Sequence, residues 1–379
     1  MSKKSGLLAL LICLLPVLLS PVSVQAQDGL SILDSSVQID FPAHLDFSLS
    51  ARNDTNITDV RLRYNIDRVS YAQITSEVYI DFVPDTEVDV NWSWDMRRTG
   101  GLPPGAVIEY WWVVLDARGK KMETKPAIVE FDDLRYSWQS LMEGEVTLYW
   151  YEGDRHFAAE LMEAAQQALA RLAEDTGAQL ETPVDIYIYA DNRDLLGSLI
   201  FPQEWTGGVA FTRFGILAIG IAPGDLDWGK GTIAHELAHL VIHQVTLNPY
   251  TDLPTWLNEG LAMYAEGQLE PYLADLLDKG IAENNLISVR SLASPFSAHR
   301  EEAALSYAQS HSLVEFLINH YGQNKMLELL NTIRRGSSYD GALNKVYGFD
   351  MDGLNTLWRD YISGRLAYGA LRLGISVVC

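Results

Sequence analysis

Cysteine is almost missing from this sequence, and basic residues are scarce. The 379 residues include two cysteines, Cys13 and Cys379, so a framework of internal disulfides is excluded. Lysine and arginine total 28 against 50 aspartates and glutamates, which gives a formal charge of −22. Binding to a phosphate backbone requires clustered basic residues. The sequence has no such cluster, and we expect no nucleic-acid partner.

Long hydrophobic runs are also missing beyond the N-terminus, where none approaches the ~18 residues of a membrane-spanning helix. At the N-terminus, Lys3 and Lys4 precede an apolar segment over residues 6–19. Val24-Gln25-Ala26 then places small residues at the two positions that a signal peptidase reads. This predicts a signal peptide over residues 1–26 and a secreted or extracytoplasmic protein with no stable membrane span after cleavage. An uncleaved N-terminal anchor is the alternative.

Short alternating segments separated by turn residues follow the signal peptide. The predicted strands cover residues 37–41, 45–49, 60–64, 78–83, 88–94, 107–115 and 127–131, and one predicted turn covers residues 53–56. This pattern predicts an all-β domain over residues 27–134, an immunoglobulin- or fibronectin-like sandwich. The tryptophans at positions 92, 94, 111 and 112 fit packing in its core, with a carbohydrate-binding platform as the alternative.

The pattern changes after residue 133. Strands are predicted over residues 146–150 and 184–189 and within 208–221, a helix over 156–176, and mostly helices from 231 onward. Strands followed by helices indicate an α+β domain, which we place at residues 135–379. The strands within 208–221 could offer a free sheet edge to an extended peptide, or could lie inside the sheet.

Two histidines and a glutamate share one turn of a predicted helix, in His235-Glu236-Leu237-Ala238-His239. Residues four apart on a helix are rotated by ~40° and offset by ~6 Å, so His235 and His239 project from one face. Both imidazoles can then reach one metal ion at ~2.0–2.1 Å. Glu236 lies one step around the helix, where its carboxylate can address water rather than the metal. His243 is one turn further, and we interpret it as a neighbouring or packing residue.

A catalytic zinc site needs a third protein ligand, and Glu259 is the best candidate. Nineteen residues separate it from His239, enough to end the first helix, turn at Asn248-Pro249 and begin a second helix around Pro254. Gly260 would lie inside that helix, where glycine costs about 1 kcal/mol relative to alanine. We therefore expect a close approach of the two helices beside the ligand. An exposed helix glutamate is the alternative interpretation.

These motifs resemble a known family. His235 to His239, followed by Trp256-Leu257-Asn258-Glu259-Gly260-Leu261-Ala262, resembles the gluzincin metallopeptidases, specifically the bacterial peptidase MA-like superfamily, and so does the segment from Tyr307 to Val314. The resemblance covers about residues 136–366. It implies a zincin-like fold and one Zn²⁺ per chain, with His235, His239 and Glu259 as ligands and Glu236 as general base. The sequence lacks the Gly-Ala-Met-Glu-Asn motif of gluzincin aminopeptidases, so endopeptidase action is the default expectation.

The resemblance implies hydrolysis of a peptide or protein by metal-activated water, with Glu236 moving the proton. A second donor should stabilise the oxyanion, and Tyr307 is the candidate, with His311 one turn further on. Both could instead belong to a helical core stripe. The sandwich could bind a protein or cell-surface partner. Two alternatives stay open, a non-catalytic surface or adhesion protein with a peptidase-like zinc-binding domain, and a zinc hydrolase acting on another bond.

Overall fold

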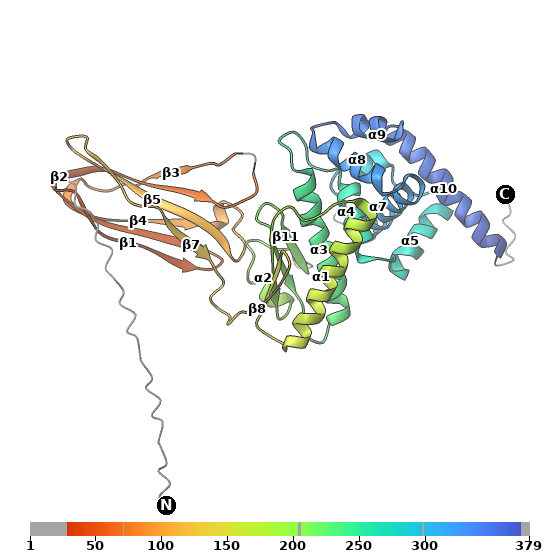
Figure 1. Cartoon of the computed structure of the whole chain (residues 1–379), viewed down its shortest axis with the longest axis horizontal. Coiled ribbons are helices and arrows are strands. Elements are labelled where there is room, and N and C mark those ends of the chain that lie inside the picture. The colour runs from red at the N-terminus through yellow and green to blue at the C-terminus, as the bar shows by residue number, and fades with distance from the viewer. Residues whose placement is uncertain (1–28, 71, 204–205, 298, 373–379) are drawn as a thin grey trace, which may run out of the picture.

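The computed structural model of this chain describes residues 29–372, except for residues 71, 204–205 and 298. The predicted signal peptide and both cysteines lie outside the described residues. A sheet-rich N-terminal region precedes a smaller sheet and a set of helices, as the coarse prediction has it (Figure 1). A search of the described helices for one that is both long and apolar enough to cross a bilayer finds none.

The N-terminal region is one connected sheet of seven strands arranged around the long strand β2. Its strands are β1 (Ser31–Asp40), β2 (His44–Ile66), β3 (Ser76–Tyr79), β4 (Asp85–Asp95), β5 (Ala106–Asp116), β6 (Lys121–Glu123) and β7 (Ala127–Phe131), with a short 3-10 helix (Met96–Arg98) after β4. The first half of β2 lies between β1 and β4, and its second half pairs with β3 and β5. The specific immunoglobulin-like topology is not confirmed by this arrangement and stays a prediction.

Strand β2 replaces two predicted strands, and the predicted turn at residues 53–56 is wrong. The turn-prone side chains of this segment instead form hydrogen bonds across the sheet. The Asn53 amide donates to the carboxylate of Asp116 at 3.1 Å, and the Thr55 hydroxyl donates to the same carboxylate at 3.2 Å. The pairing of β2 becomes irregular here, between Arg52 and Ile57, where it passes from β4 to β5. A remote partner therefore keeps the chain extended where local preference favours a turn.

The core of this region contains two of the predicted core tryptophans. Trp112 is fully buried and Trp94 nearly so, among apolar residues of β2, β4 and β5. Trp92 is partly buried and stacks on Phe47, with ring centroids 5.8 Å apart. Packing, rather than a carbohydrate platform, is therefore what the structure shows for Trp94 and Trp112.

A second, five-stranded sheet has the strand order β11-β12-β10-β9-β8. The strands are β8 (Gln139–Glu143), β9 (Val146–Trp150), β10 (Val184–Tyr189), β11 (Gly208–Phe211) and β12 (Ile216–Gly220). β9, β10 and β12 are parallel, and β8 and β11 run antiparallel to their neighbours. Helix α1 (Arg155–Thr176) begins at the side-chain cap of Asp154 and ends at Gly177, whose φ of 73° favours glycine. The predicted strands at 146–150 and 184–189 and the predicted helix are confirmed.

The remainder of the described chain is mostly helical, as expected. Its helices are α2 (Asn192–Leu196), α3 (Leu226–Thr246), α4 (Thr255–Glu266), α5 (Pro271–Ala282), α6 (Val289–Leu292), α7 (Arg300–Tyr321), α8 (Gln323–Arg334), α9 (Tyr339–Tyr347) and α10 (Met351–Arg372). One side of α3 packs with α1 against the five-stranded sheet, and the other side joins the core formed by α4, α7 and α8. Helix α3 is therefore the central element of this part of the molecule.

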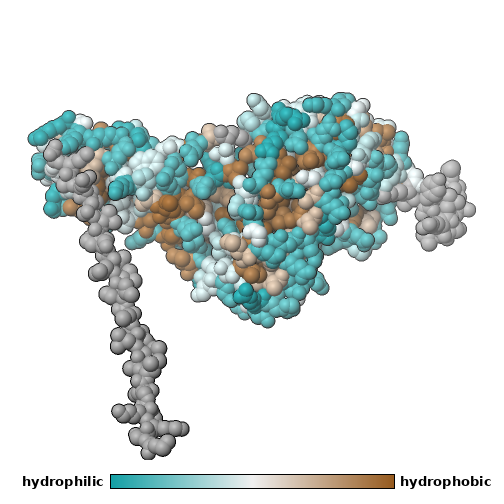
Figure 2. All heavy atoms as spheres, in the orientation of Figure 1, coloured by the Kyte–Doolittle hydropathy of each residue, from teal (hydrophilic) through white to brown (hydrophobic). Residues whose placement is uncertain are grey.

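The two sheets are in direct contact. The backbone N–H of Val69 donates to the carbonyl of Arg213 at 2.6 Å, and Ile200 and Phe214 pack against the core of the seven-stranded sheet. A Cβ on Gly105 would lie 2.2 Å from the Tyr187 hydroxyl, so only glycine allows this approach. Hydrophobic residues gather near the middle of the face drawn in Figure 2, between its largely hydrophilic ends. The proposed domain division at residue 134 stays a prediction.

Candidate metal centre

Helix α3 presents His235 and His239 on the same side. Their Nε2 atoms lie 3.2 Å apart, and the rings meet edge to face. On another side of α3, Ile233, Leu237 and Leu240 are fully buried in the core beneath the five-stranded sheet. This burial fixes the rotation of the helix and leaves its two histidines facing α4.

Glu259 on α4 completes a group of three. Its Oε2 lies 3.6 Å from Nε2 of His235 and 3.5 Å from Nε2 of His239. Four tetrahedral ligands at ~2.0–2.1 Å from zinc would be about 3.3–3.4 Å from one another. The observed separations match this value, and two imidazoles with one carboxylate form a typical donor set for catalytic zinc. The residues therefore fit a zinc ion, although their role as ligands stays a prediction.

Gly260 does allow a close helix approach, but not the one that the sequence predicts. A Cβ at this position would lie 2.4 Å from the carbonyl oxygen of Ser310 and 2.7 Å from Cγ2 of Val314, both on α7. The close contact is thus between α4 and α7, rather than between α4 and α3. Sequence spacing identifies a crowded glycine but not the helix that crowds it.

Glu266, the last residue of α4, is a site residue that sequence reasoning missed. Its carboxylate oxygen Oε1 lies 2.5 Å from Nδ1 of His235. Such a bond fixes the ring and directs its other nitrogen toward a metal. Glu266 follows Glu259 by seven residues, about two helical turns, which places both on one side of α4. This spacing is the signal that could have identified it.

His235 and Glu259 shift each other's pKa. Burial lowers the pKa of His235, but hydrogen bonds with Glu259 and Glu266 outweigh burial and raise it to about 10. Burial raises the pKa of Glu259, yet the hydrogen bond from His235 and the charge of His239 lower it overall. The carboxylate of Glu259 is therefore held as an anion, and its negative charge favours a cation.

Glu236 lies between α3 and the edge of the five-stranded sheet. Burial raises the pKa of its carboxyl group, an effect that the two imidazoles oppose and that Glu259 and Glu266 reinforce. A Cβ on Gly208, the first residue of β11, would lie 3.0 Å from Oε1 of Glu236. β11 is the last strand on its side of the sheet among the described residues, and β12 is internal. The free-edge interpretation thus holds for β11, and the internal-strand interpretation holds for β12.

Helix α7 carries Tyr307 and His311 in different surroundings. Burial raises the pKa of Tyr307 to about 12, and the negative charges of Glu259 and Glu236 add to the rise. The phenol therefore interacts electrostatically with both carboxylates. His311 is buried, and its Nε2 lies 3.2 Å from the carbonyl oxygen of Gly267. A carbonyl only accepts, so this nitrogen donates and is occupied. Tyr307 stays a candidate for catalysis, whereas His311 stabilises the end of α4.

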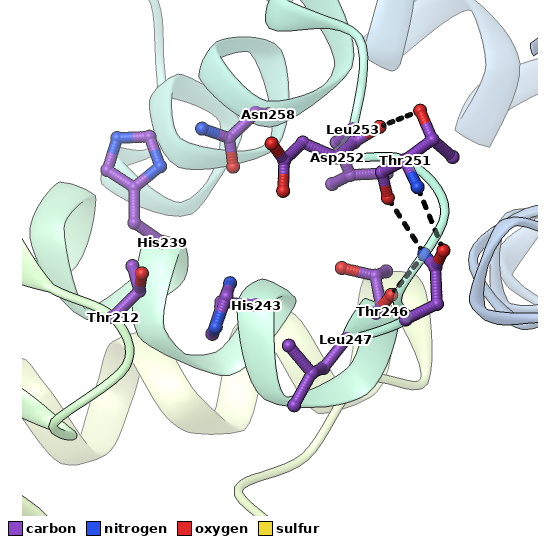
Figure 3. Close-up of a pocket in the computed structure, with 10 residues that line it drawn as sticks. Thr212, His239, His243, Thr246, Leu247, Thr251, Asp252, Leu253 and Asn258 are labelled. Carbon is purple, nitrogen blue, oxygen red and sulfur yellow. Dashed lines mark hydrogen bonds between the residues drawn. The ribbon is translucent and has the colours of Figure 1, made fainter. Parts of the chain in front are cut away.

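His243 lies outside the three-residue group. Its Nε2 atom is buried and has no hydrogen-bond partner among the described residues, and the same holds for Nδ1 of His239. Both side chains line a pocket beside the three-residue group (Figure 3).

Several solved structures are similar to this chain. The M1 zinc metallopeptidase of Deinococcus radiodurans matches at 15% identity over 88% of this chain and 94% of that chain, with a TM-score of 0.36. Legionella pneumophila aminopeptidase A, solved with aspartic acid, matches at 12% identity over 87% of this chain and 50% of that chain, with a TM-score of 0.40. OgpA of Akkermansia muciniphila, solved with an O-glycopeptide, matches at 9% identity over 28% of this chain and 30% of OgpA, with a TM-score of 0.22. Likenesses this remote support no inference about activity.

The sequence comparison is more specific. No curated protein sequence matches the chain. The family model described as the Peptidase MA superfamily matches residues 164–364, which is more than half of the chain and includes α3, α4 and α7. The resemblance to gluzincin-type peptidases that the two metal motifs indicate is thereby confirmed. This chain belongs to the Peptidase MA superfamily.

Proposed function

We propose that this protein is a zinc-dependent metallopeptidase in which His235, His239 and Glu259 hold one Zn²⁺. The observation that carries the proposal is the convergence of these three side chains, whose ligand atoms all lie within 4.8 Å of one another. When bound, zinc acts as a Lewis acid toward the substrate carbonyl and lowers the pKa of water toward neutrality.

Glu236 is the proposed general base. Its carboxylate accepts the proton of the attacking water and later delivers that proton to the leaving amine. Burial raises the pKa of its carboxyl group, which favours a base that holds the proton between these two transfers. Gly208 packs against the Glu236 carboxylate, so the edge strand β11 lies beside the proposed general base.

The free edge of β11 is the proposed support for an extended substrate. Backbone groups at a sheet edge can pair with a peptide and hold its carbonyl beside the metal centre. Pairing of this kind needs no free substrate terminus, and we infer that the protein acts as an endopeptidase. The predicted signal peptide at residues 1–26 places this activity outside the cytoplasm. The proposed sandwich domain at residues 27–134 would contact a protein or cell-surface partner.

Tyr307 is the proposed donor to the oxyanion. With its pKa raised to about 12, the hydroxyl keeps its proton at neutral pH and can donate it in a hydrogen bond. Loss of one such donor lowers kcat by about 10²–10³-fold in other hydrolases. We expect Tyr307→Phe to reduce kcat by about this factor while the zinc content stays unchanged. An unchanged kcat would remove Tyr307 from the mechanism.

Zinc content tests the metal centre without any choice of substrate. The chain from Gln27 onward should hold about one zinc per molecule after metal-replete purification, and Glu259→Ala should hold much less. Glu236→Gln should keep the zinc and lose peptide hydrolysis, because the amide cannot accept the proton. Unchanged hydrolysis by Glu236→Gln would contradict the general-base assignment. A wild type without zinc would favour the non-catalytic surface protein.

A further inference from the structure

A polar pocket opens beside the metal centre, and the mechanism proposed above makes no use of it. It lies between the C-terminal half of α3, the connection from α3 to α4, and the start of α4 (Figure 3). Its cavity volume is about 180 Å³, well above the ~10–15 Å³ that one water needs and enough for a side chain. His239 belongs both to the three-residue metal group and to the pocket wall. A group in the pocket would therefore lie next to the scissile bond.

The wall of the pocket is held in place by its own hydrogen bonds. The Asn248 amide donates to the carbonyls of Thr246 and Thr251 at 3.0 and 2.9 Å, and its oxygen accepts from the backbone N–H groups of Tyr250 and Thr251. Tyr339 of α9 donates to the carbonyl of Asp252 at 3.1 Å. Preorganised walls of this kind reduce the conformational entropy lost on binding.

Several side chains that line the pocket can accept hydrogen bonds, while Asn258 and Thr212 also carry donors. The hydroxyl of Thr246 donates to the carbonyl of Ile242 at 2.6 Å, and that of Thr251 donates to the carbonyl of Asp252 at 3.1 Å. The protons of both hydroxyls are therefore engaged with backbone carbonyls. The carboxylate of Asp252 accepts only, and among the described residues no ion pair to it is found. Figure 3 shows the side chains of Asp252 and Asn258 across the pocket from that of His243.

His243 contributes a further unsatisfied group. Burial lowers the pKa of its ring, and the charge of Arg213 lowers it further against the opposing effect of Asp252. The ring is therefore neutral at pH 7, and its buried Nε2 has no partner among the described residues. An unsatisfied buried nitrogen is costly, but this atom is closed to solvent and is not itself a contact for a ligand in the pocket.

We propose that this pocket binds the side chain of a substrate residue adjacent to the scissile bond and selects lysine or arginine, with Asp252 as the counter-ion. This inference rests on the proposed peptidase function. Lysine and arginine carry only hydrogen-bond donors, three and five respectively, and complement the carboxylate of Asp252. A charge-assisted bond to a carboxylate is also stronger than a neutral one. Arg213 and Asp252 are both exposed, and of the two only Asp252 is among the residues that line the pocket.

The test compares lysine with norleucine, which has the same carbon chain without the amine. Digestion of a peptide library, read by mass spectrometry, should show lysine or arginine on one side of the cleaved bond. A lysine peptide should then be cleaved with a higher kcat/KM than its norleucine counterpart. Asp252→Asn keeps the size of the side chain and removes its charge, and should reduce this ratio by about tenfold to a hundredfold. Arg213→Gln is the matched control and should not reduce the ratio.

The possible results separate this inference from the proposed function. Hydrolysis without preference for the basic residue, or a preference that survives in Asp252→Asn, would overturn the pocket assignment and leave the peptidase standing. If no peptide is cleaved, the proposed function fails, and binding still tests the pocket. Calorimetry with the Glu236→Gln protein should show tighter binding of the lysine peptide than of the norleucine peptide. Equal binding of the two would overturn the inference.

Discussion

Replacement of Gly260 by alanine should destabilise the helical part of the molecule, because a backbone blocks the added methyl group. Its Cβ would lie 2.4 Å from the Ser310 carbonyl oxygen, 2.9 Å from its carbon and 2.7 Å from Cγ2 of Val314. Ordinary contacts begin near ~3.5 Å, so α4 and α7 would have to separate by about 1 Å. Overpacking costs about 1–3 kcal/mol, and the better helix propensity of alanine offsets up to about 1 kcal/mol. We expect a net loss of about 1 kcal/mol.

Thermal unfolding followed by circular dichroism measures this loss, which corresponds to about 2–4 °C in Tm for a unit of about 150–250 residues. Because Glu259 is the neighbouring residue, the same displacement should weaken zinc binding, whose ligand distances tolerate about ±0.2 Å. Gly231→Ala is the matched control, since it lies within α3 and an added Cβ meets nothing within 4 Å. That substitution should be neutral or stabilise by up to about 1 kcal/mol. Equal stability of the two variants would refute the steric argument.

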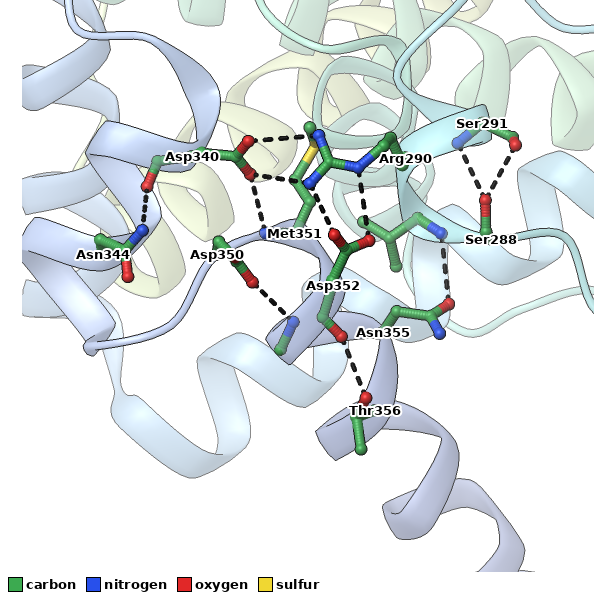
Figure 4. Close-up of polar contacts among 12 residues, drawn as sticks. Ser288, Arg290, Ser291, Asp340, Asn344, Asp350, Met351, Asp352, Asn355 and Thr356 are labelled. Carbon is green, nitrogen blue, oxygen red and sulfur yellow. Dashed lines mark hydrogen bonds and ion pairs between the residues drawn. The ribbon is translucent and has the colours of Figure 1, made fainter.

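Two further predictions concern charged groups. Glu266→Gln should weaken zinc binding by about 10–100-fold, measured by competition with a chelator, because a neutral amide orients His235 less firmly; unchanged affinity would show that the bond has no orienting role. Asp340 accepts a hydrogen bond from the backbone N–H of Met351 and pairs with Arg290 (Figure 4). The pKa of its carboxyl group lies below the usual value, mainly because of the bond from Met351 and then because of Arg290. A carboxyl group whose pKa is lower in the folded protein stabilises the fold at pH values above its unfolded pKa of ~3.9. This stabilisation is lost as pH falls through the pKa of the folded state. Asp340→Asn should therefore lower the free energy of unfolding at pH 7, and this free energy should fall less steeply below about pH 4, as measured by urea titrations. An unchanged fall of the unfolding free energy below pH 4 would contradict this.

Features that depend on helical period were predictable, because they are local. The four-residue spacing of His235 and His239 places both on one face of any helix, whatever surrounds it. The predicted helix over residues 156–176 likewise matches α1 to within one residue. The failure at residues 53–56 has the opposite cause, since Asp116, about 60 residues away, supplies the bonds that keep β2 extended.

The metal centre combines both kinds of information. The sequence alone identified Glu259 as the candidate third ligand and Gly260 as a crowded position, from spacing and propensity. It could not identify α7 as the helix against Gly260 or Glu266 as the partner of His235. Those contacts depend on how α3, α4 and α7 pack, which the residues of no single helix specify.

The sequence by itself determined the family, the change from a strand-rich to a helix-rich region, and the two motifs that supply the candidate ligands. Only the tertiary structure decided that Glu259 lies 3.5–3.6 Å from both histidines, that β11 forms a sheet edge, and that Asp252 and His243 share a pocket. Motifs and periodicity are properties of neighbouring residues. The distances that make a binding site arise between residues far apart in the chain, and they are set by the packing of one core against another.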